Sequence, residues 1–456
     1  MKVSWNPESA EPPPDPGWRR ARTTVSLPES HASIRVSRDD RVWRKMLAFA
    51  GPGLLVAVGY MDPGNWATDL AGGARYGYRL LSVILLANIC AMVLQHLALK
   101  LGIVARRDLA QACRDHFGRR VNFALWILCE IAIAACDLAE VIGSAIALNL
   151  LFGLPLVWGV MITAIDVMIV LLLQNWGFRA LEAVVVALIL TIGGCFAYEM
   201  AIARPELPAM LLGLIPRPEV IRDPGMLYIA IGILGATVMP HNLYLHSSVV
   251  QTRAFERTDE GKAMAIRFAT IDSNVSLSLA FFINAAILVL SATAFHGTAH
   301  EDVADINDAY ELLTPVLSAP LASAFFAIAL LASGQNSTIT GTLAGQIVME
   351  GFLNLRLRPW LRRLITRLIA IVPAAIVAAA SGARGVGSLL ILSQVILSLQ
   401  LSFAVVPLVM FTGDREKMGR FANSRSLTLV AWTMSAIIIV LNAYLLLLAV
   451  REWLPE

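Results

Sequence analysis

Two helix-breaking motifs lie inside long hydrophobic segments, and they constrain the fold more than any other feature of the chain. The first is Asp62-Pro63-Gly64-Asn65, and the second is Ala236-Thr237-Val238-Met239-Pro240-His241. A break in a membrane helix frees backbone carbonyl and amide groups, and each costs several kcal/mol if it is left bare in lipid. Paired breaks in corresponding halves of a chain therefore predict a transporter whose substrate site lies between them.

The composition indicates an integral membrane protein. Of the 456 residues, 57% are hydrophobic and only 15% are charged, whereas a soluble protein carries about 25% charged residues. The formal net charge of +3 says little about partners, and we expect none among nucleic acids. The five cysteines are an odd number without loop-to-loop spacing, which argues against a disulfide framework.

Apolar segments predict an all-α fold of eleven transmembrane helices, because about 20 apolar residues cross a bilayer. The predicted spans are 47–74, 78–104, 121–151, 155–174, 179–202, 226–251, 264–295, 318–352, 361–381, 386–411 and 426–450. Residues 1–44 are polar and rich in proline and arginine, without an apolar run. We therefore expect a mostly disordered cytoplasmic tail without a cleavable signal peptide, followed by a transporter domain over 45–452.

Basic residues alternate between successive loops. They concentrate in the loops at 100–120, 253–267, 356–363 and 415–420, whereas the loop at 296–310 has none. The positive-inside rule then places the N-terminus in the cytoplasm and, with eleven spans, the C-terminus outside the cell membrane. The loop between the fifth and sixth spans, with three arginines, is the exception.

The broken spans are the first and the sixth, and they sit five helices apart. An odd repeat length makes the two halves insert in opposite orientations. We therefore predict inverted repeats over about 45–202 and about 226–411, with an appended helix over about 426–450.

The donor atoms at the two breaks suit a divalent transition metal. Asp62 supplies a charged oxygen and Asn65 a neutral one, while Pro240 cannot donate to the carbonyl of Ala236 and so leaves it free. Met239 adds a thioether, which favours polarisable metals, whereas Mg²⁺ and Ca²⁺ prefer oxygen ligands alone. The alternative is a helix kink capped by Asp62 and a Met239 that packs in the core.

Three acids in the third span lie on one helical face. Glu130, Asp137 and Glu140 are separated by offsets of seven and three residues. Carboxylates inside a membrane helix need partners or water, so this face is a candidate exit route for protons. The alternative is an ion-pair network with the arginines at the start of the ninth span, which are Arg362, Arg363 and Arg367.

Other polar residues also lie within the predicted spans. His241 is a candidate ligand, proton carrier or packing residue, and we prefer the proton carrier because an unperturbed histidine pKa is about 6.5. Gln394 in the tenth span is a candidate for completing the metal shell when the site closes. Asp166 and Asp272 are further acids in apolar segments, and the sequence assigns no role to them.

No phosphate-binding loop or nucleotide fingerprint occurs in the sequence. Transport energy must then come from an ion gradient. We expect no enzymatic activity, no catalytic residues and no permanently bound cofactor, with the metal as substrate and the proton as co-substrate.

At these motifs the chain resembles the Nramp family (natural resistance-associated macrophage proteins), in particular its bacterial proton-coupled manganese transporters. The family's Asp-Pro-Gly-Asn and Met-Pro-His signatures are both intact, at residues 62–65 and 239–241, and 137–140 matches its acidic pair. The resemblance covers about residues 45–450. Two positions depart from the family pattern: Cys136, where a small hydroxylated residue is common, and Ser402, where proline is common.

The resemblance implies a leucine-transporter-like fold that works by alternating access. It also implies symport of Mn²⁺ or Fe²⁺ with protons and tolerance of Cd²⁺, Co²⁺ and Zn²⁺. Carried over by position, Asp62, Asn65, the carbonyl of Ala236 and Met239 bind the metal. The proton route carried over in the same way consists of Asp62, His241, Asp137 and Glu140.

Three rival functions are weighed. A non-transporting metal sensor is expected to carry a cytoplasmic signalling domain, and the sequence shows none. A magnesium or trivalent-metal transporter on the same fold is expected to lack the thioether of Met239. A sodium-coupled amino-acid transporter is expected to carry glycine-rich amides at the breaks rather than an acid and a thioether. The sequence does not decide between Mn²⁺ and Fe²⁺, and a functional monomer is the default because one chain is enough to form the site.

Overall fold

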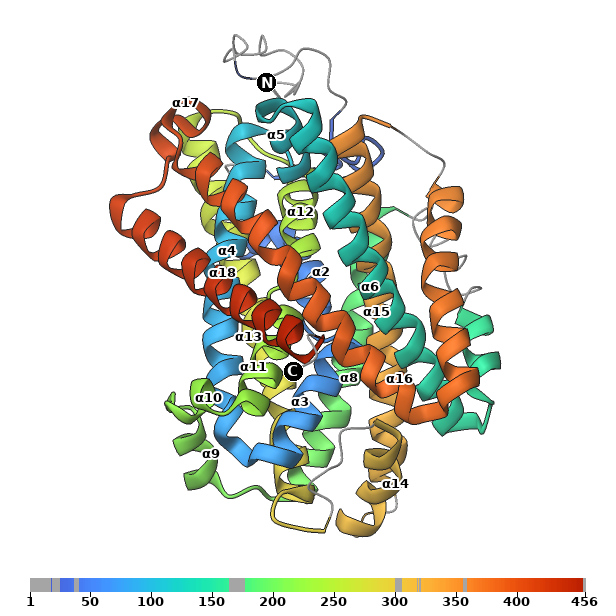
Figure 1. Cartoon of the computed structure of the whole chain (residues 1–456). Coiled ribbons are helices and arrows are strands. Elements are labelled where there is room, and N and C mark those ends of the chain that lie inside the picture. Colours follow the sequence, from blue (N-terminus) through green and yellow to red (C-terminus); the bar gives the residue numbers. More distant parts are fainter. Residues whose placement is uncertain are drawn as a thin grey trace.

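The computed structural model describes residues 18, 25–36, 41–163, 177–299, 306–317, 319, 321–355 and 359–453. Long helices stand side by side and make up nearly all of this part of the chain (Figure 1). They are α4 (Leu81–Ala105), α6 (Arg119–Phe152), α8 (Phe178–Ala203), α13 (Asp259–Phe295), α15 (Ala322–Leu353), α16 (Pro359–Gly413) and α18 (Arg425–Trp453).

Both predicted breaks are present. The first span consists of α2 (Pro52–Gly59) and α3 (Pro63–Tyr76), and the sixth of α11 (Pro224–Thr237) and α12 (Pro240–Val249). A proline begins each of the second halves, where its missing N–H costs nothing because the first amides of a helix have no partner within the helix. Figure 1 shows these four helices in the middle of the bundle, where the longer helices surround them.

The predicted number of eleven spans is not confirmed. Among the described residues, seven helices are long and apolar enough to cross a membrane, or eight if the bent pair α1 (Val42–Phe49) and α2 is one span. One reason is that α16 is continuous where two spans were predicted, although its ribbon folds back on itself in Figure 1. Another is that most of the predicted span 155–174 lies outside the described residues.

The short elements gather at the two ends of the bundle. The end at the top of Figure 1 carries α5 (Leu109–His116) and α17 (Arg415–Met418), and the opposite end carries α9 (Leu207–Gly213), α10 (Glu219–Arg222) and α14 (Ile306–Leu317). The 3₁₀ turns are η1 (Gly77–Leu80), η2 (Val250–Thr252) and η3 (Gly419–Phe421). The basic loops of α5 and α17 thus share one end, as their charge pattern predicts.

Part of the predicted N-terminal tail is ordered, which corrects the expectation of disorder for residues 25–36. There β1 (Ile34–Arg35) pairs in parallel with β2 (Arg253–Ala254), directly after the sixth span. The hydroxyl of Ser26, also buried, lies 2.6 Å from both Asp108 Oδ2 and Ser248 Oγ. Leu27 and Val36 of this segment are buried in apolar clusters with distant parts of the chain. The sequence missed the segment because isolated apolar residues in a polar stretch do not reveal such partners.

Candidate metal centre

Asp62 is the N-cap of α3, which places its carboxylate at the break of the first span. Its Oδ1 accepts a hydrogen bond from the backbone N–H of Asn65 at 2.9 Å and another from Asn65 Nδ2 at 2.6 Å. Both residues are at most 1% exposed. An anion at a helix N-terminus is stabilised by the free amides and the helix dipole, so the local sequence fixes this carboxylate in position.

Asn65 joins the two breaks. Its Nδ2 donates to the carbonyl of Ala236 at 3.1 Å, in addition to Asp62 Oδ1, and more weakly to the carbonyl of Gly59 at 3.4 Å. Oxygens of Gly59 and Asp62 from the first break and of Ala236 from the second therefore converge on this one donor nitrogen. A point where several oxygens face one positively polarised group is also a point where they could face a cation.

Several buried polar atoms around this point have no hydrogen-bond partner in the described part of the chain. They are Asp62 Oδ2, Asn65 Oδ1 and Gln394 Oε1. An unsatisfied buried polar group costs about 1–3 kcal/mol, so such a concentration calls for an explanation. All three atoms are acceptors, which is the character that a cation requires.

Gln394 reaches this point because Gly64 has no side chain. A Cβ built on Gly64 would lie 1.6 Å from Gln394 Nε2, which no pair of atoms can tolerate. The Gln394 side chain is fully buried, and its Nε2 donates to Ser393 Oγ at 3.0 Å. The glycine of the first motif therefore serves close approach between α3 and α16.

Met239 occupies the second break as the N-cap of α12 and is fully buried. It packs in a small cluster with Ala132 and Cys136 of α6 and Leu397 of α16. Its thioether thus lies among apolar neighbours from other spans rather than in solvent. In the described residues no three His, Cys, Asp or Glu side chains form a group that could hold a metal ion. The candidate donors at the two breaks are a carboxylate, amide and carbonyl oxygens and a thioether.

The predicted proton-route residues on α6 and α12 are close to one another. His241 Nε2 lies 3.8 Å from Cys136 Sγ, which lies 3.7 Å from Glu140 Oε1. A Cβ on Gly341 would lie 2.7 Å from Glu140 Oε1 and 3.4 Å from Asp137 Oδ1, so this glycine lets α15 approach the two acids. The pair of acids and His241 are all at most 1% exposed.

The other predicted proton-route positions are less well defined. Glu130 is only partly buried, and its Oε1 accepts from Trp126 Nε1 at 3.1 Å. The side chains of Arg362, Arg363 and Arg367 lie outside the described residues, and so does Asp166. The predicted ion-pair network therefore stays a prediction.

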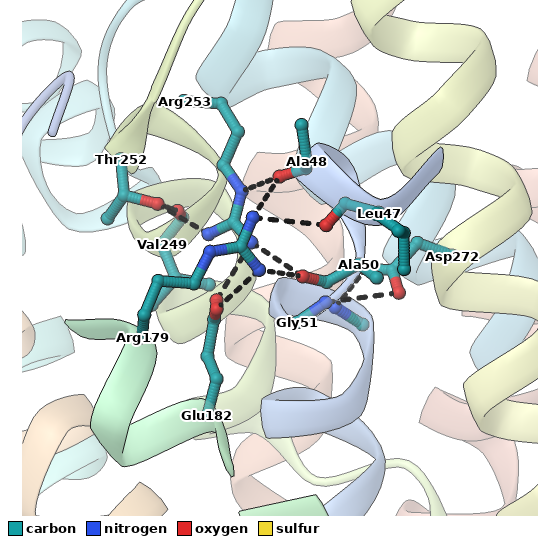
Figure 2. Close-up of polar contacts among 11 residues, drawn as sticks. Leu47, Ala48, Ala50, Gly51, Arg179, Glu182, Val249, Thr252, Arg253 and Asp272 are labelled. Atoms are coloured by element: carbon teal, nitrogen blue, oxygen red, sulfur yellow. Dashed lines mark hydrogen bonds and ion pairs between the residues drawn. The ribbon is translucent and has the colours of Figure 1, made fainter. Parts of the chain in front are cut away.

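The first span has a further break that the sequence analysis missed, between α1 and α2, which are bent by 41°. Figure 2 shows two arginines, one from α8 and one from β2, converging on the carbonyls at the end of α1. Arg253 donates to Ala48 O at 2.9 Å and Ala50 O at 2.8 Å, and Arg179 donates to Leu47 O, Ala48 O and Ala50 O at 2.9–3.0 Å.

Acids complete the same arrangement (Figure 2). Asp272 of α13 accepts from the amides of Gly51 at 3.3 Å and Gly53 at 2.7 Å, and Glu182 of α8 forms a 2.8 Å ion pair with Arg253. Burial lowers the pKa of Arg253, and the charge of Glu182 opposes this shift. Arg179, Glu182, Arg253 and Asp272 form what we call the inner clamp.

The inner clamp gives Asp272 the role that the sequence did not assign. A signal was nevertheless present, since Gly51-Pro52-Gly53 precedes the first motif, and Gly-Pro and Pro-Gly pairs mark turns. Gly51 has φ of 135°, and a Cβ there would lie 2.1 Å from Glu182 Oε1. The glycine is therefore required both by backbone conformation and by packing.

Comparison with known proteins places this geometry in a family. A family model described as natural resistance-associated macrophage protein-like (Nramp) matches residues 53–448. A divalent metal cation transporter MntH from Nostoc is 61% identical over 431 residues, which are 94% of this chain and 98% of that protein. The crystal structure of a manganese transporter from Eremococcus coleocola superposes with a TM-score of 0.86 at 43% identity, over 92% of this chain and 90% of that one.

A more distant likeness concerns the fold alone. The structure of MhsT in complex with L-phenylalanine has a TM-score of 0.58 at 15% identity, and it covers 86% of this chain and 98% of that one. This likeness confirms the predicted leucine-transporter-like class of fold.

Proposed function

The chain belongs to the natural resistance-associated macrophage protein-like (Nramp) family, and from this premise we propose that it imports Mn²⁺ and related divalent transition metals, with protons, by alternating access. The names of its relatives, a divalent metal cation transporter and a manganese transporter, support divalent metal ions as the substrate class. Because these relatives are transporters, we propose that the chain is an integral membrane transporter and not an enzyme.

One observation carries the proposal. Asp62 Oδ1 and the carbonyl of Ala236 converge on Asn65 Nδ2 while the carboxyl and amide oxygens Asp62 Oδ2 and Asn65 Oδ1 have no partner among the described residues. We propose that the Asn65 amide group occupies the place of the metal. When the metal enters, the amide rotates so that Oδ1 rather than Nδ2 faces the ion. The nitrogen and oxygen of an amide are close in size, so the exchange needs little room.

Met239 supplies the soft ligand from the other break, and Gln394 joins the shell as the site closes. Carboxylate, amide and carbonyl oxygens alone would suit Mg²⁺ or Ca²⁺, whereas a thioether favours more polarisable ions. This is why we prefer Mn²⁺, Fe²⁺, Co²⁺ and Cd²⁺ to the magnesium or trivalent-metal alternative. The membrane potential, negative inside, adds about 2.3 kcal/mol per charge per 100 mV.

For the proton we propose Asp62 as the entry point and the third-span acids as the exit, with His241 beside them. The short separations from His241 through Cys136 to Glu140 support this route. Asp137 and Glu140 would carry the proton toward the end that holds α5, with Glu130 and the arginines 362, 363 and 367 further along. We also propose a functional monomer without a bound cofactor, in the inner cell membrane, with its N-terminus in the cytoplasm and its C-terminus outside.

The test is Mn²⁺ uptake into proteoliposomes at two pH gradients. We expect uptake by the wild type, faster with an acidic exterior, and none by Asp62→Ala. Met239→Ala is expected to weaken Cd²⁺ transport and to admit Mg²⁺ or Ca²⁺. Met226→Ala is the matched control, because Met226 is also buried in the sixth span but packs in a separate apolar cluster around α3 and α4.

Two results would overturn the proposal. If the wild type ignores Mn²⁺, the substrate assignment fails, and the magnesium-type alternative takes its place. If Mn²⁺ enters without acidification of the vesicle lumen, measured with an enclosed pH dye, the proton coupling fails while the metal assignment stands.

A further inference from the structure

Cys136 lies on α6 where potential metal ligands from several elements meet. Its Sγ is 3.7 Å from Glu140 Oε1 and 3.8 Å from His241 Nε2, and it packs in one buried cluster with Met239. Cys136 is 3% exposed. The position therefore brings a second sulfur next to the thioether of the proposed metal centre.

The charges around Cys136 favour a cation. Its sulfur interacts electrostatically with three carboxylates, those of Glu140, Asp62 and Asp137. One of these carboxylates, that of Asp62, has a buried oxygen, Oδ2, without a hydrogen-bond partner in the described part of the chain. An ion that enters beside Met239 would therefore meet a second sulfur together with an unsatisfied carboxylate oxygen.

We propose that Cys136 is a specificity-determining residue, which gives soft, thiol-binding ions such as Cd²⁺ a second sulfur ligand beside Met239. This inference rests on the proposed function, because it assigns a ligand at the same centre. The described residues contain no preformed cluster of three His, Cys, Asp or Glu side chains. Cys136 therefore adds to the substrate centre and does not build a separate, resident metal site.

The chemistry follows from ligand softness. A thiolate favours soft ions such as Cd²⁺ more strongly than Mn²⁺, which is more polarisable than Mg²⁺ but also suits carboxylate, carbonyl and water oxygens. The metal ligand is the thiolate, so the S–H bond breaks as the S–Cd bond forms. The proton passes to Glu140 Oε1, the acceptor of the Cys136 thiol. The carboxylate becomes a neutral acid, and the ion keeps one net positive charge with the sulfur.

The direct test is the sulfur-to-cadmium charge-transfer absorption of the purified, full-length protein during titration with Cd²⁺. We expect the band in the wild type and its loss in Cys136→Ser, with a Cd²⁺ affinity that falls about tenfold, the lower end of the loss when a metal site loses a supporting group. Cys195→Ser is the matched control, because Cys195 is a buried cysteine of α8 in the main apolar core. The Cys195→Ser variant is expected to keep both the absorption band and the Cd²⁺ affinity of the wild type.

Transport provides a second arm. The Cd²⁺ concentration that halves Mn²⁺ uptake is expected to rise about tenfold in Cys136→Ser, more than any change in the Mn²⁺ concentration for half-maximal uptake. Cys136→Ala must show the same shift, which guards against a folding defect of the serine variant.

The outcomes separate this inference from the proposed function. The role of Cys136 would be overturned if the absorption band persists in both Cys136 variants, even if Mn²⁺ uptake is normal. It would also be overturned if the inhibitory Cd²⁺ concentration and the Mn²⁺ concentration for half-maximal uptake rise by the same factor. A wild type without Mn²⁺ uptake would overturn the proposed function, while the absorption band would still decide whether Cys136 binds the ion.

Discussion

The first span is interrupted twice, and the two interruptions differ in how their polar groups are satisfied. At Ala50 and Gly51, the inner clamp supplies two arginines for the freed carbonyls and one carboxylate for the amides. At Asp62 and Asn65, buried oxygens of both side chains have no partner in the described residues. Because lipid offers no replacement partners, a satisfied break can be structural, whereas an unsatisfied one is where we propose that a ligand binds.

The largest effect is expected when the satisfied break loses its central charge. Arg253→Gln should lower the free energy of unfolding by about 3 kcal/mol, the lower end of the cost of breaking a buried ion pair, because Glu182 keeps Arg179 as a second cation at 3.0 Å. Thermal unfolding in detergent would measure this loss. The Arg179→Gln variant is the control, because the Arg179 side chain is 47% exposed whereas that of Arg253 is fully buried. Equal effects of both substitutions would mean that burial does not set the strength of the clamp.

Gly51→Ala perturbs the same break by straining its backbone. The alanine would have to adopt φ near 135°, and its Cβ would lie 2.1 Å from Glu182 Oε1. We expect a loss of about 1–3 kcal/mol, the cost of one strained residue. Gly193→Ala in α8 is the matched control, since its Cβ meets no atom within 4 Å. That variant should be neutral or slightly more stable, and destabilisation by both would show that any added methyl group is harmful here.

Gly64→Ala perturbs the other break, where oxygens of Asp62 and Asn65 have no partner in the described residues. Its Cβ would displace Gln394, and we expect Mn²⁺ affinity to fall about 10–100-fold, as when a metal site loses a supporting group. Isothermal titration with Mn²⁺ would measure it. Unchanged affinity would show that Gln394 has no part in the metal shell.

The smallest effect is expected at Asp108, which lies outside the spans. It tests whether hydrogen bonds to a buried carboxylate offset the cost of burying its charge. Its two oxygens accept from Ser26 and from the amide of Gln111, yet burial raises its pKa to about 6 from 3.8. A raised carboxyl pKa stabilises the folded state at low pH, and this contribution is lost as the pH rises through about 6.

Asp108→Asn keeps a good N-cap and removes the titration. Relative to this variant, the wild type should lose about 1 kcal/mol of stability between pH 5 and pH 7.5. Unfolding temperatures of both proteins at the two pH values would measure the difference. An equal difference in unfolding temperature between the wild type and Asp108→Asn at both pH values would contradict the raised pKa of Asp108.

The sequence predicted the unsatisfied break well and the satisfied one not at all. Asp62 and Pro63 are adjacent along the chain, and so are Met239 and Pro240, so the cap and the missing donor at each break can be inferred locally. The inner clamp joins α1, α8, β2 and α13, and no local pattern indicates that Arg253 faces Ala50. Arg253 was counted only as a positive charge of a cytoplasmic loop.

Other differences have similar causes. Ser402, which departs from the family pattern, accepts a 3.3 Å hydrogen bond from Asn442, and this contact links α16 to α18, the next long helix along the chain. The ordered segment 25–36 depends on a strand partner beyond residue 250. Contacts of such long range depend on the tertiary arrangement, which a single sequence does not reveal.

The most direct test compares the same chemical change at the two breaks, by isothermal titration of Mn²⁺ into wild type, Asp62→Asn and Asp272→Asn. Our account predicts that Asp62→Asn binds Mn²⁺ at least about 100-fold more weakly, at the upper end of the losses expected at metal sites. It predicts that Asp272→Asn keeps most of the affinity and loses thermal stability instead. Wild-type affinity in Asp62→Asn, or an equal loss in both variants, would contradict the distinction between a binding break and a structural one.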